Sequence, residues 1–377
     1  MAIKSETRHT EKIENSESVR SWPAPHPHDT WFLSLILLVG LGSVFAFSRL
    51  GAALTQPAIG TTTKLAQEQL YNFPNNAGLM QPAIDTRGNL WVGEMYANRL
   101  ASLNTHTGVV KTWQAPHGND GIMDVTIAAN GNVWYVEQDA NYIGSFNPTT
   151  QKFQVFPLNT CNGRAVGPQD LQFDAQGNLW FTGASGGCIG VLHPTSGQIQ
   201  LWPVPAPRTG VAALPYSLTI THSGQIWFGY LTGGALGHFD PTTGHTQLYH
   251  LKNAGAQIFS MAADAQGRIW FSEILPGAIG MLNPKTGKMT KLPVPASGGQ
   301  PAALYELVVT PNGTVWSVNS GADTLVAYSP TQNHFTIFKL ATLTGAPYGL
   351  TLDTHNYLWV TYSGSEENAV GKIQANI

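Results

Sequence analysis

The chain has 377 residues, a formal net charge of −3 and only 11% charged residues. Because soluble proteins contain roughly 25% charged residues, this composition favours strands that are packed on both faces. The weak negative charge, with no clustered lysines or arginines, excludes the basic footprint of a nucleic-acid-binding protein. Length alone does not require two folded domains, since one closed all-β domain can be this long.

The N-terminus differs from the rest of the chain. Residues 1–30 are polar, carry charges of both signs and predict a disordered tail. Residues 31–48 contain no charge and are just long enough to span a bilayer, so we expect a transmembrane signal anchor with the repeat region that follows it on the extracytoplasmic side. A cleaved signal peptide is the alternative, with processing near Ala52 and Ala53, although the leader is long for one. A buried core helix is disfavoured because the segment precedes the repeats.

Tryptophans recur at spacings of 43, 46, 47, 43, 46 and 43 residues. Each ends a Gly-x-apolar-Trp phrase or a near copy of it; the seven are Trp91, Trp134, Trp180, Trp227, Trp270, Trp316 and Trp359. A period of about 40–50 residues, built from short apolar strands and turns, is typical of a β-propeller. We therefore predict an all-β, seven-bladed β-propeller over residues 66–377, joined to the anchor by a linker at residues 49–65.

Each repeat predicts four strands, as in residues 171–174, 179–182, 189–192 and 198–203. The turn between the first two strands begins in four repeats with an aspartate that is expected to bind turn amides: Asp85, Asp174, Asp264 and Asp353. The last repeat ends after its third strand, while residues 69–74 resemble the fourth strand at 200–205. We expect this N-terminal strand to complete the last blade and close the ring without a covalent bond.

A site is expected around the mouth of the central channel, where loops from all blades meet. The position eleven residues before each tryptophan and the position three after it supply aromatic candidates for ligand binding: Tyr216, Phe259, Tyr305, Tyr348, Tyr230 and Tyr362. Carboxylates at or beside these positions could hold Mg²⁺ or Ca²⁺; they are Glu94, Glu137, Glu273, Asp124 and Asp170. A carboxyl with a raised pKa could also act as a base, which makes Glu273 and Glu306 catalytic candidates. The alternative is that these residues face water or cap loop amides.

The sequence contains two cysteines, Cys161 and Cys188. Cys161 falls in the loop before the third repeat and Cys188 opens the third strand of that repeat, so both belong on the same face. A disulfide between them is expected if the ring is extracytoplasmic, and two free thiols if it is cytoplasmic.

Several blade phrases resemble one known family. They are Leu179-Trp-Phe-Thr-Gly, Ile269-Trp-Phe-Ser-Glu, Ala278-Ile-Gly-Met-Leu-Asn-Pro and Ala346-Pro-Tyr-Gly-Leu. Over about residues 66–377 the chain resembles the virginiamycin B lyase (streptogramin lyase) family of β-propellers. The resemblance implies an enzyme that opens a cyclic depsipeptide antibiotic by elimination at an ester, with Mg²⁺ and a histidine base, and hence a role in antibiotic resistance.

The residues that match the family's catalytic positions differ here. The family's Glu-Pro-His-Gly phrase corresponds to Ala346-Pro347-Tyr348-Gly349, so Tyr348 stands where the resemblance implies the histidine base. Tyr305 stands in place of a second histidine, and Tyr362 in place of a carboxylate ligand. Tyr348 could serve as the base only with a strongly lowered pKa.

The sequence supports three hypotheses about function. The first is an anchored extracytoplasmic propeller that has lost the lyase chemistry and binds a small molecule or a protein at the channel mouth. The second is an active metal-dependent carbon–oxygen lyase whose acids have moved to Glu94, Glu137 and Glu273. The third is a protein-interaction ring of the NHL type. In each case we expect a monomer that contacts the membrane through residues 31–48.

Overall fold

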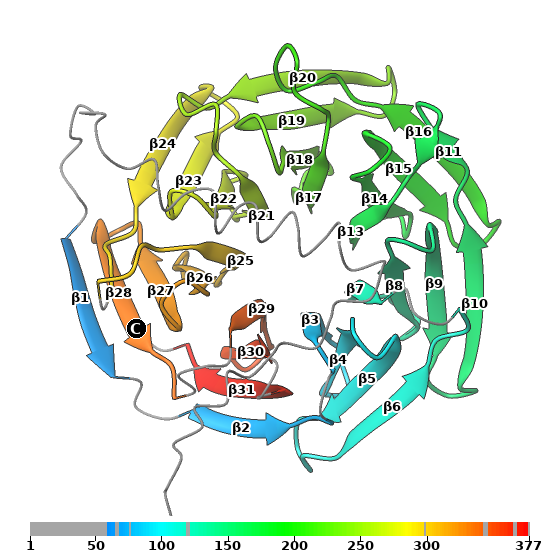
Figure 1. Ribbon diagram of the computed structural model, residues 1–377, viewed down its shortest axis with the longest axis horizontal. Coiled ribbons are helices and arrows are strands. Elements are labelled where there is room, and N and C mark those ends of the chain that lie inside the picture. The colour runs from blue at the N-terminus through cyan, green and yellow to red at the C-terminus, as the bar shows by residue number, and fades with distance from the viewer. Residues whose placement is uncertain are drawn as a thin grey trace, which may run out of the picture. The chain divides into compact units, whose positions relative to one another are not determined.

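The computed structural model describes residues 59–64, 68–74, 77–117, 121–297, 299–341, 346–364 and 368–375. Its described part is entirely β-structure and contains six four-stranded sheets, one five-stranded sheet and one two-stranded hairpin. The seven larger sheets form the blades of a ring, with the first strand of each blade innermost (Figure 1). The predicted seven-bladed propeller is confirmed.

Blades 1 to 4 each run from the inner to the outer strand in chain order. Blade 1 contains β3 (Leu79–Ile84), β4 (Asn89–Glu94), β5 (Arg99–Asn104) and β6 (Val110–Gln114). Blade 2 contains β7 (Ile122–Ile127), β8 (Val133–Glu137), β9 (Tyr142–Asn147) and β10 (Lys152–Pro157). Blade 3 contains β13 (Pro168–Phe173), β14 (Leu179–Gly183), β15 (Cys188–His193) and β16 (Gln198–Pro203), and blade 4 contains β17 (Pro215–Ile220), β18 (Ile226–Tyr230), β19 (Ala235–Asp240) and β20 (His245–His250).

Three further blades complete the ring. Blade 5 contains β21 (Ile258–Ala263), β22 (Ile269–Glu273), β23 (Ala278–Asn283) and β24 (Lys288–Pro293). Blade 6 contains β25 (Leu304–Val309), β26 (Val315–Asn319), β27 (Thr324–Ser329) and β28 (His334–Lys339), and blade 7 contains β29 (Pro347–Leu352), β30 (Tyr357–Ser363) and β31 (Asn368–Gln374). The hairpin of β11 (Thr160–Cys161) and β12 (Arg164–Ala165) lies in the connection from blade 2 to blade 3.

The N-terminal segment contributes a strand to each of two blades. β2 (Glu68–Asn72) pairs antiparallel with β31 and becomes the fourth strand of blade 7, so the predicted closure is confirmed. β1 (Ile59–Lys64), within the segment expected to be a linker, pairs parallel with β28 as a fifth strand on the outside of blade 6 (Figure 1). Its residues Gly60 to Thr63 are exposed, and this lack of apolar alternation explains why β1 could not be recognised from the sequence.

The hydrophobic core lies between the blades rather than within them. Trp359 of blade 7, for example, is fully buried in a cluster with Leu79, Leu90 and Val92 of blade 1. The equivalent tryptophans Trp91, Trp227 and Trp316 each pack against the following blade in the same way. The recurring tryptophan is therefore the residue that joins one blade to the next.

A recurring glycine in the third strand has a steric cause. Gly190 of β15 pairs with Phe181 of β14, and a Cβ atom at Gly190 would lie only 2.2 Å from the Phe181 ring. Gly144, Gly237 and Gly280 meet the rings of Tyr135, Phe228 and Phe271 in the same register. The Ile-Gly phrase of the repeats thus makes room for the aromatic ring that follows each tryptophan.

In the part of the chain that the structure describes, no helix is long and apolar enough to span a bilayer. The predicted tail and anchor, residues 1–30 and 31–48, lie outside the described residues.

Candidate functional site in the central channel

The central channel is lined by the innermost strands, and every one of these strands carries a bulge near its start. In blade 3 the pairing register shifts between Pro168 and Leu171, and the other six inner strands shift at the equivalent place. A bulge breaks the alternation of side chains along a strand and re-aims them. Both the second and the third residue of each inner strand are therefore able to contribute to the channel.

The second residues of four successive inner strands form one aromatic cluster, made of Tyr216, Phe259, Tyr305 and Tyr348. The Phe259 ring centroid lies 5.2 Å from that of Tyr216, 4.7 Å from that of Tyr305 and 5.5 Å from that of Tyr348. The rings of Tyr305 and Tyr348 are also 5.5 Å apart. Tyr216, Phe259 and Tyr348 are buried and Tyr305 is half-buried, so the rings mainly cover one another. Four of the six predicted ligand-binding aromatics are thus brought together.

The other two predicted aromatics lie inside their blades instead. Tyr230 is fully buried and donates a hydrogen bond to the carbonyl of Pro205 at 2.6 Å. Tyr362 is fully buried as well, and its hydroxyl donates to the carboxylate of Glu68 on the N-terminal strand. Tyr230 is the last residue of β18 and Tyr362 the last but one of β30, and at this end of the second strand the ring packs toward neighbouring strands rather than toward the channel.

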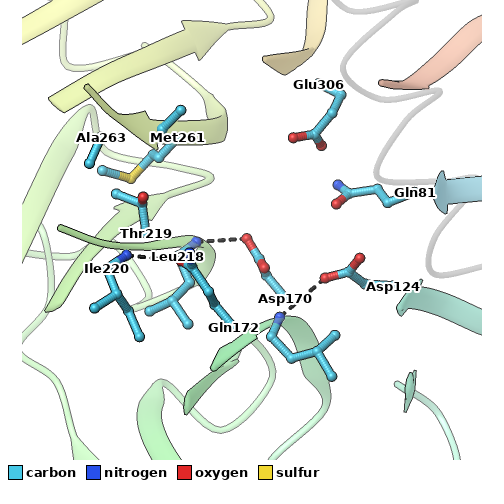
Figure 2. A pocket seen from close by; sticks show the side chains of 12 residues that line it. Gln81, Asp124, Asp170, Gln172, Leu218, Thr219, Ile220, Met261, Ala263 and Glu306 are labelled. Atoms are coloured by element: carbon cyan, nitrogen blue, oxygen red, sulfur yellow. Dashed lines mark hydrogen bonds between the residues drawn. The ribbon is translucent and has the colours of Figure 1, made fainter. Parts of the chain in front are cut away.

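A cavity of about 290 Å³ lies in the channel beside the aromatic cluster. Its lining comes from the third to sixth residues of the inner strands, so it extends from the cluster toward the turns that join the first and second strands. Figure 2 shows Gln81, Asp124, Asp170 and Glu306 around a common space. None of the described residues that line the cavity is a lysine, arginine or histidine.

The three carboxyl groups of the cavity are held by hydrogen bonds. Asp124 accepts from the backbone N–H of Leu171 in the next blade at 3.1 Å, and Asp170 accepts from that of Leu218 at 2.7 Å. Glu306 accepts at one oxygen from the Ser260 hydroxyl at 2.6 Å, while its Oε2 has no hydrogen-bond partner among the described residues. Adjacent inner strands are thus linked through the same side chains that form the cavity wall.

Burial raises the pKa of all three acids. It raises the pKa of Asp170 to about 6 and that of Glu306 to about 8. Burial also raises the pKa of Asp124 well above its usual range, and repulsion from Asp170 and Glu306 raises it further. Near neutral pH the group therefore holds protons that ordinary carboxylates would lose, and it can donate or accept a proton or pair with a cation.

The pKa values of the tyrosines in the aromatic cluster are raised, whereas a general base would need a lowered one. Burial raises the pKa of Tyr348 well above its usual value, and the neighbouring Tyr216 raises it further. Burial likewise raises the pKa of Tyr216 and of Tyr305. A tyrosine can accept a proton only as the phenolate, so this environment opposes the role of Tyr348 as a general base.

The three glutamates at the ends of second strands do not line this cavity. Glu94 forms an ion pair with Arg99, Glu137 accepts from the Tyr142 hydroxyl, and Glu273 pairs with Lys291. Each partner belongs to the same blade as its glutamate, and all three glutamates are fully buried. The structure thus brings Asp124 and Asp170 together but leaves Glu94, Glu137 and Glu273 in separate blades.

Magnesium, which the resemblance implies, fits these positions poorly. Tyr305, Tyr348 and Tyr362 supply none of the carboxylate oxygens that Mg²⁺ prefers. Across the described ranges, no group of three or more histidine, cysteine, aspartate or glutamate side chains is placed to hold a metal ion.

Three hydroxyl residues around the channel were not singled out from the sequence. Thr182, Ser272 and Thr361 lie two residues after a tryptophan, and each donates to a carbonyl of the next blade's inner strand, at 2.6 to 2.9 Å. Each also accepts from a backbone N–H at the bulge of its own blade, at 2.8 to 3.1 Å. They position the inner strands, and the recurring Trp-x-Thr or Trp-x-Ser phrase was the available signal.

The two cysteines are buried free thiols in this structure, Cys161 in β11 and Cys188 at the start of β15. They lie beside the connection that leads into β13, on the same side of blade 3, as the repeat pattern predicts.

Comparison with known proteins identifies the family context. The sequence model of the virginiamycin B lyase family matches residues 52–320 and 160–376. A virginiamycin B lyase from Staphylococcus aureus is 19% identical, covers 82% of this chain and 99% of its own, and superposes with a TM-score of 0.73. A streptogramin B lyase structure is 23% identical, with 82% and 98% coverage and a TM-score of 0.72. YCF48 bound to a D1 peptide shares the fold at 13% identity, with 83% and 98% coverage and a TM-score of 0.63. No curated protein matches the chain.

Proposed function

Because the chain belongs to the virginiamycin B lyase family, we propose that it is a ligand-binding member of that family that lacks the lyase reaction. The proposed protein is held to a membrane by residues 31–48, with the propeller on the extracytoplasmic side, as the N-terminal sequence suggests. Its ligand-binding site is the acidic cavity of the central channel.

The aromatic cluster is the main support for the proposed loss of the lyase reaction. Tyr305 and Tyr348 occupy two positions where the resemblance implies histidines, and their rings pack on Phe259. Burial raises the pKa of both hydroxyls, which removes proton abstraction from their chemistry at neutral pH. Tyr362, at the third position, is engaged with Glu68 inside blade 7.

The cavity supports a ligand that carries a protonated amine. Asp124, Asp170 and Glu306 face a common space with no cationic side chain in its lining (Figure 2). A cationic ligand would stabilise the ionised carboxylates, which burial otherwise disfavours. Met261 and Leu218 add apolar wall, so a small amphipathic organic amine suits the cavity better than a bare ion.

The test combines turnover and binding on the full chain. When the protein is incubated with a streptogramin B and Mg²⁺, the depsipeptide ring should open no faster than in the protein-free control. Calorimetric titration with small organic amines should give binding that Asp170→Asn weakens about tenfold, as expected for the loss of a buried ionic partner. The control Asp240→Asn removes a carboxylate from a turn outside the cavity and should bind like the unaltered protein. Absence of amine binding at any pH between 6 and 9 would refute the ligand class.

A second candidate is a lyase whose acids have moved to other positions. The raised pKa values of Asp170 and Glu306 favour it, because a carboxyl that titrates near neutral pH suits general acid–base catalysis. Turnover of a streptogramin B that a chelator abolishes would establish this function in place of the first. Loss of that turnover in Glu273→Gln, but not in Glu306→Gln, would place the chemistry at the strand ends, and the reverse would place it in the cavity.

A further inference from the structure

The two cysteines lie where the β11–β12 hairpin meets blade 3. Cys161 belongs to the β11–β12 hairpin, in the connection from blade 2, and Cys188 opens β15. They are the only cysteines of the sequence, and both are buried, with exposed fractions of 5% and 0%. Gly186, two residues before Cys188, lies against Cys161, and the Cys161 thiol is near enough to raise the pKa of Cys188, so the two cysteine side chains are neighbours.

Glycines and backbone hydrogen bonds hold the hairpin against the blade at this contact. Asn162 donates from Nδ2 to the carbonyl of Gly186 at 2.9 Å, and the Gly186 N–H donates to the Val166 carbonyl at 3.0 Å. A Cβ atom at Gly183 would lie 2.8 Å from the Cys188 sulfur, and one at Gly186 would lie 3.1 Å from Cβ of Cys161. A side chain at either glycine would therefore crowd the two cysteines.

The reactivity of the pair depends on the hairpin. Burial raises the pKa of the Cys188 thiol, and the neighbouring Cys161 thiol raises it further, so Cys188 is a poor nucleophile while the hairpin is closed. The hairpin itself is exposed at Thr160 and from Asn162 to Ala165. Its own two strands share a ladder of only two residue pairs, so local opening of the hairpin can bring Cys161 to the solvent.

We propose that Cys161 and Cys188 are a paired oxidation site, in which a disulfide fastens the β11–β12 hairpin to blade 3. The oxidant is a small disulfide of the glutathione class. The thiolate of one cysteine attacks a sulfur of the oxidant, forming a mixed disulfide and releasing one small thiol. The thiolate of the other cysteine then displaces the second small thiol, so two protein thiols and one small disulfide become one protein disulfide and two small thiols.

Oxidation restrains the segment that leads into β13. This segment runs from the hairpin through Val166 and Gly167 to Gln169 and Asp170 at the channel. The cross-link closes a loop between residues 161 and 188 and reduces the freedom of the unfolded chain. The proposal concerns the stability of this face and does not depend on the ligand in the cavity.

The experiment treats the full chain with oxidised glutathione and, separately, with dithiothreitol. The oxidised protein should lose both free thiols and two hydrogen masses, and it should yield a cross-linked peptide that contains Cys161 and Cys188. Its melting temperature should exceed that of the reduced protein by about 5 °C, from the loop-closure effect in a domain of this size.

Single substitutions separate the cross-link from effects on packing. In Cys161→Ser and in Cys188→Ser, the melting temperature should be the same in oxidant and reductant, whatever its absolute value. A protein that keeps both thiols through prolonged incubation near its melting temperature would overturn the proposal. So would one that gains two glutathione adducts without a cross-linked peptide.

Discussion

At the residue scale, the acids of the channel link adjacent inner strands by hydrogen bonds, although burial disfavours their ionised form. Asp124, Asp170 and Ser260 bind backbone N–H groups of the following inner strand, and Glu306 binds Ser260 in turn. The same burial that makes these bonds strong penalises the ionised carboxyls. A site that tolerates such a penalty is a candidate for a function that uses the charge.

The energetic cost of ionising a buried carboxyl can be measured at Glu306. Its pKa in the folded protein, about 8, lies above the ordinary glutamate value, so the folded state binds more protons than the unfolded state between roughly pH 4.5 and pH 8. The free energy of unfolding should therefore fall as pH rises through this window. Glu306→Gln should remove much of the fall and be more stable than the unaltered protein at pH 8 by about 2 kcal/mol.

Denaturant unfolding at pH 5 and at pH 8 measures both effects. Asp240→Asn is the control, because hydrogen bonds within its turn lower the pKa of Asp240 and it stays ionised throughout this window. An unchanged pH slope in Glu306→Gln would show that Glu306 is not the group responsible.

At the scale of the element, the turn between the first two strands occurs in two forms that alternate from blade 1 to blade 7 along the chain. In blades 1, 3, 5 and 7 an aspartate accepts the turn amides and also the indole N–H of the blade's tryptophan; the pairs are Asp85–Trp91, Asp174–Trp180, Asp264–Trp270 and Asp353–Trp359. Blades 2, 4 and 6 have Ala128, Thr221 and Thr310 instead. The indole N–H of Trp134, Trp227 and Trp316 has no partner in the described structure. The predicted role of the aspartates is confirmed, and the bond to tryptophan is an addition.

Ala128→Asp should supply the missing acceptor in blade 2. The turn at Ala128 makes the same backbone hydrogen bonds as the turn at Asp85, so an aspartate can adopt the same geometry. The free energy of unfolding should rise by about 1 kcal/mol through the new bond to Trp134. Denaturant titration checks this, with the Trp134→Phe background as the control in which the gain should vanish. A gain that persists in that background would assign the effect to the turn amides alone.

At the scale of the whole molecule, the ring is closed by strand pairing and not by a covalent bond. β2 supplies the outer strand of blade 7, and Phe73 joins the cluster in which Trp359 packs on blade 1. Glu68 accepts from the N–H of Ala341, after blade 6, and from the hydroxyl of Tyr362 in blade 7. The N-terminal segment is therefore bound to two blades beside the point of closure.

Two truncations separate the contributions of the N-terminal strands. A chain that begins after residue 74 loses β2 and exposes the edge of β31, and it should lose its cooperative thermal transition or aggregate. A chain that begins at residue 65 loses only the exposed β1, and its melting temperature should fall by no more than about 3 °C. Differential scanning calorimetry with size-exclusion chromatography measures both. Equal stability of the two truncated chains would contradict closure by β2.

The sequence by itself determined the architecture, because the signals for it are local and repeated. The tryptophan period sets the number of blades, and the incomplete last repeat, with its match at residues 69–74, predicts the closing strand. Each of these features needs only the neighbouring residues of one repeat, so no knowledge of the ring is required to read it.

Only the tertiary structure decided which candidate side chains meet, because their partners come from other blades or from the blade's own outer strands. Asp170 meets Leu218 of the next blade, and Phe259 meets rings from three other blades. Glu273 instead turns to Lys291 within blade 5. The bulges at the inner strands set these directions, and a bulge leaves the repeat pattern unchanged while it re-aims the side chains that form the channel.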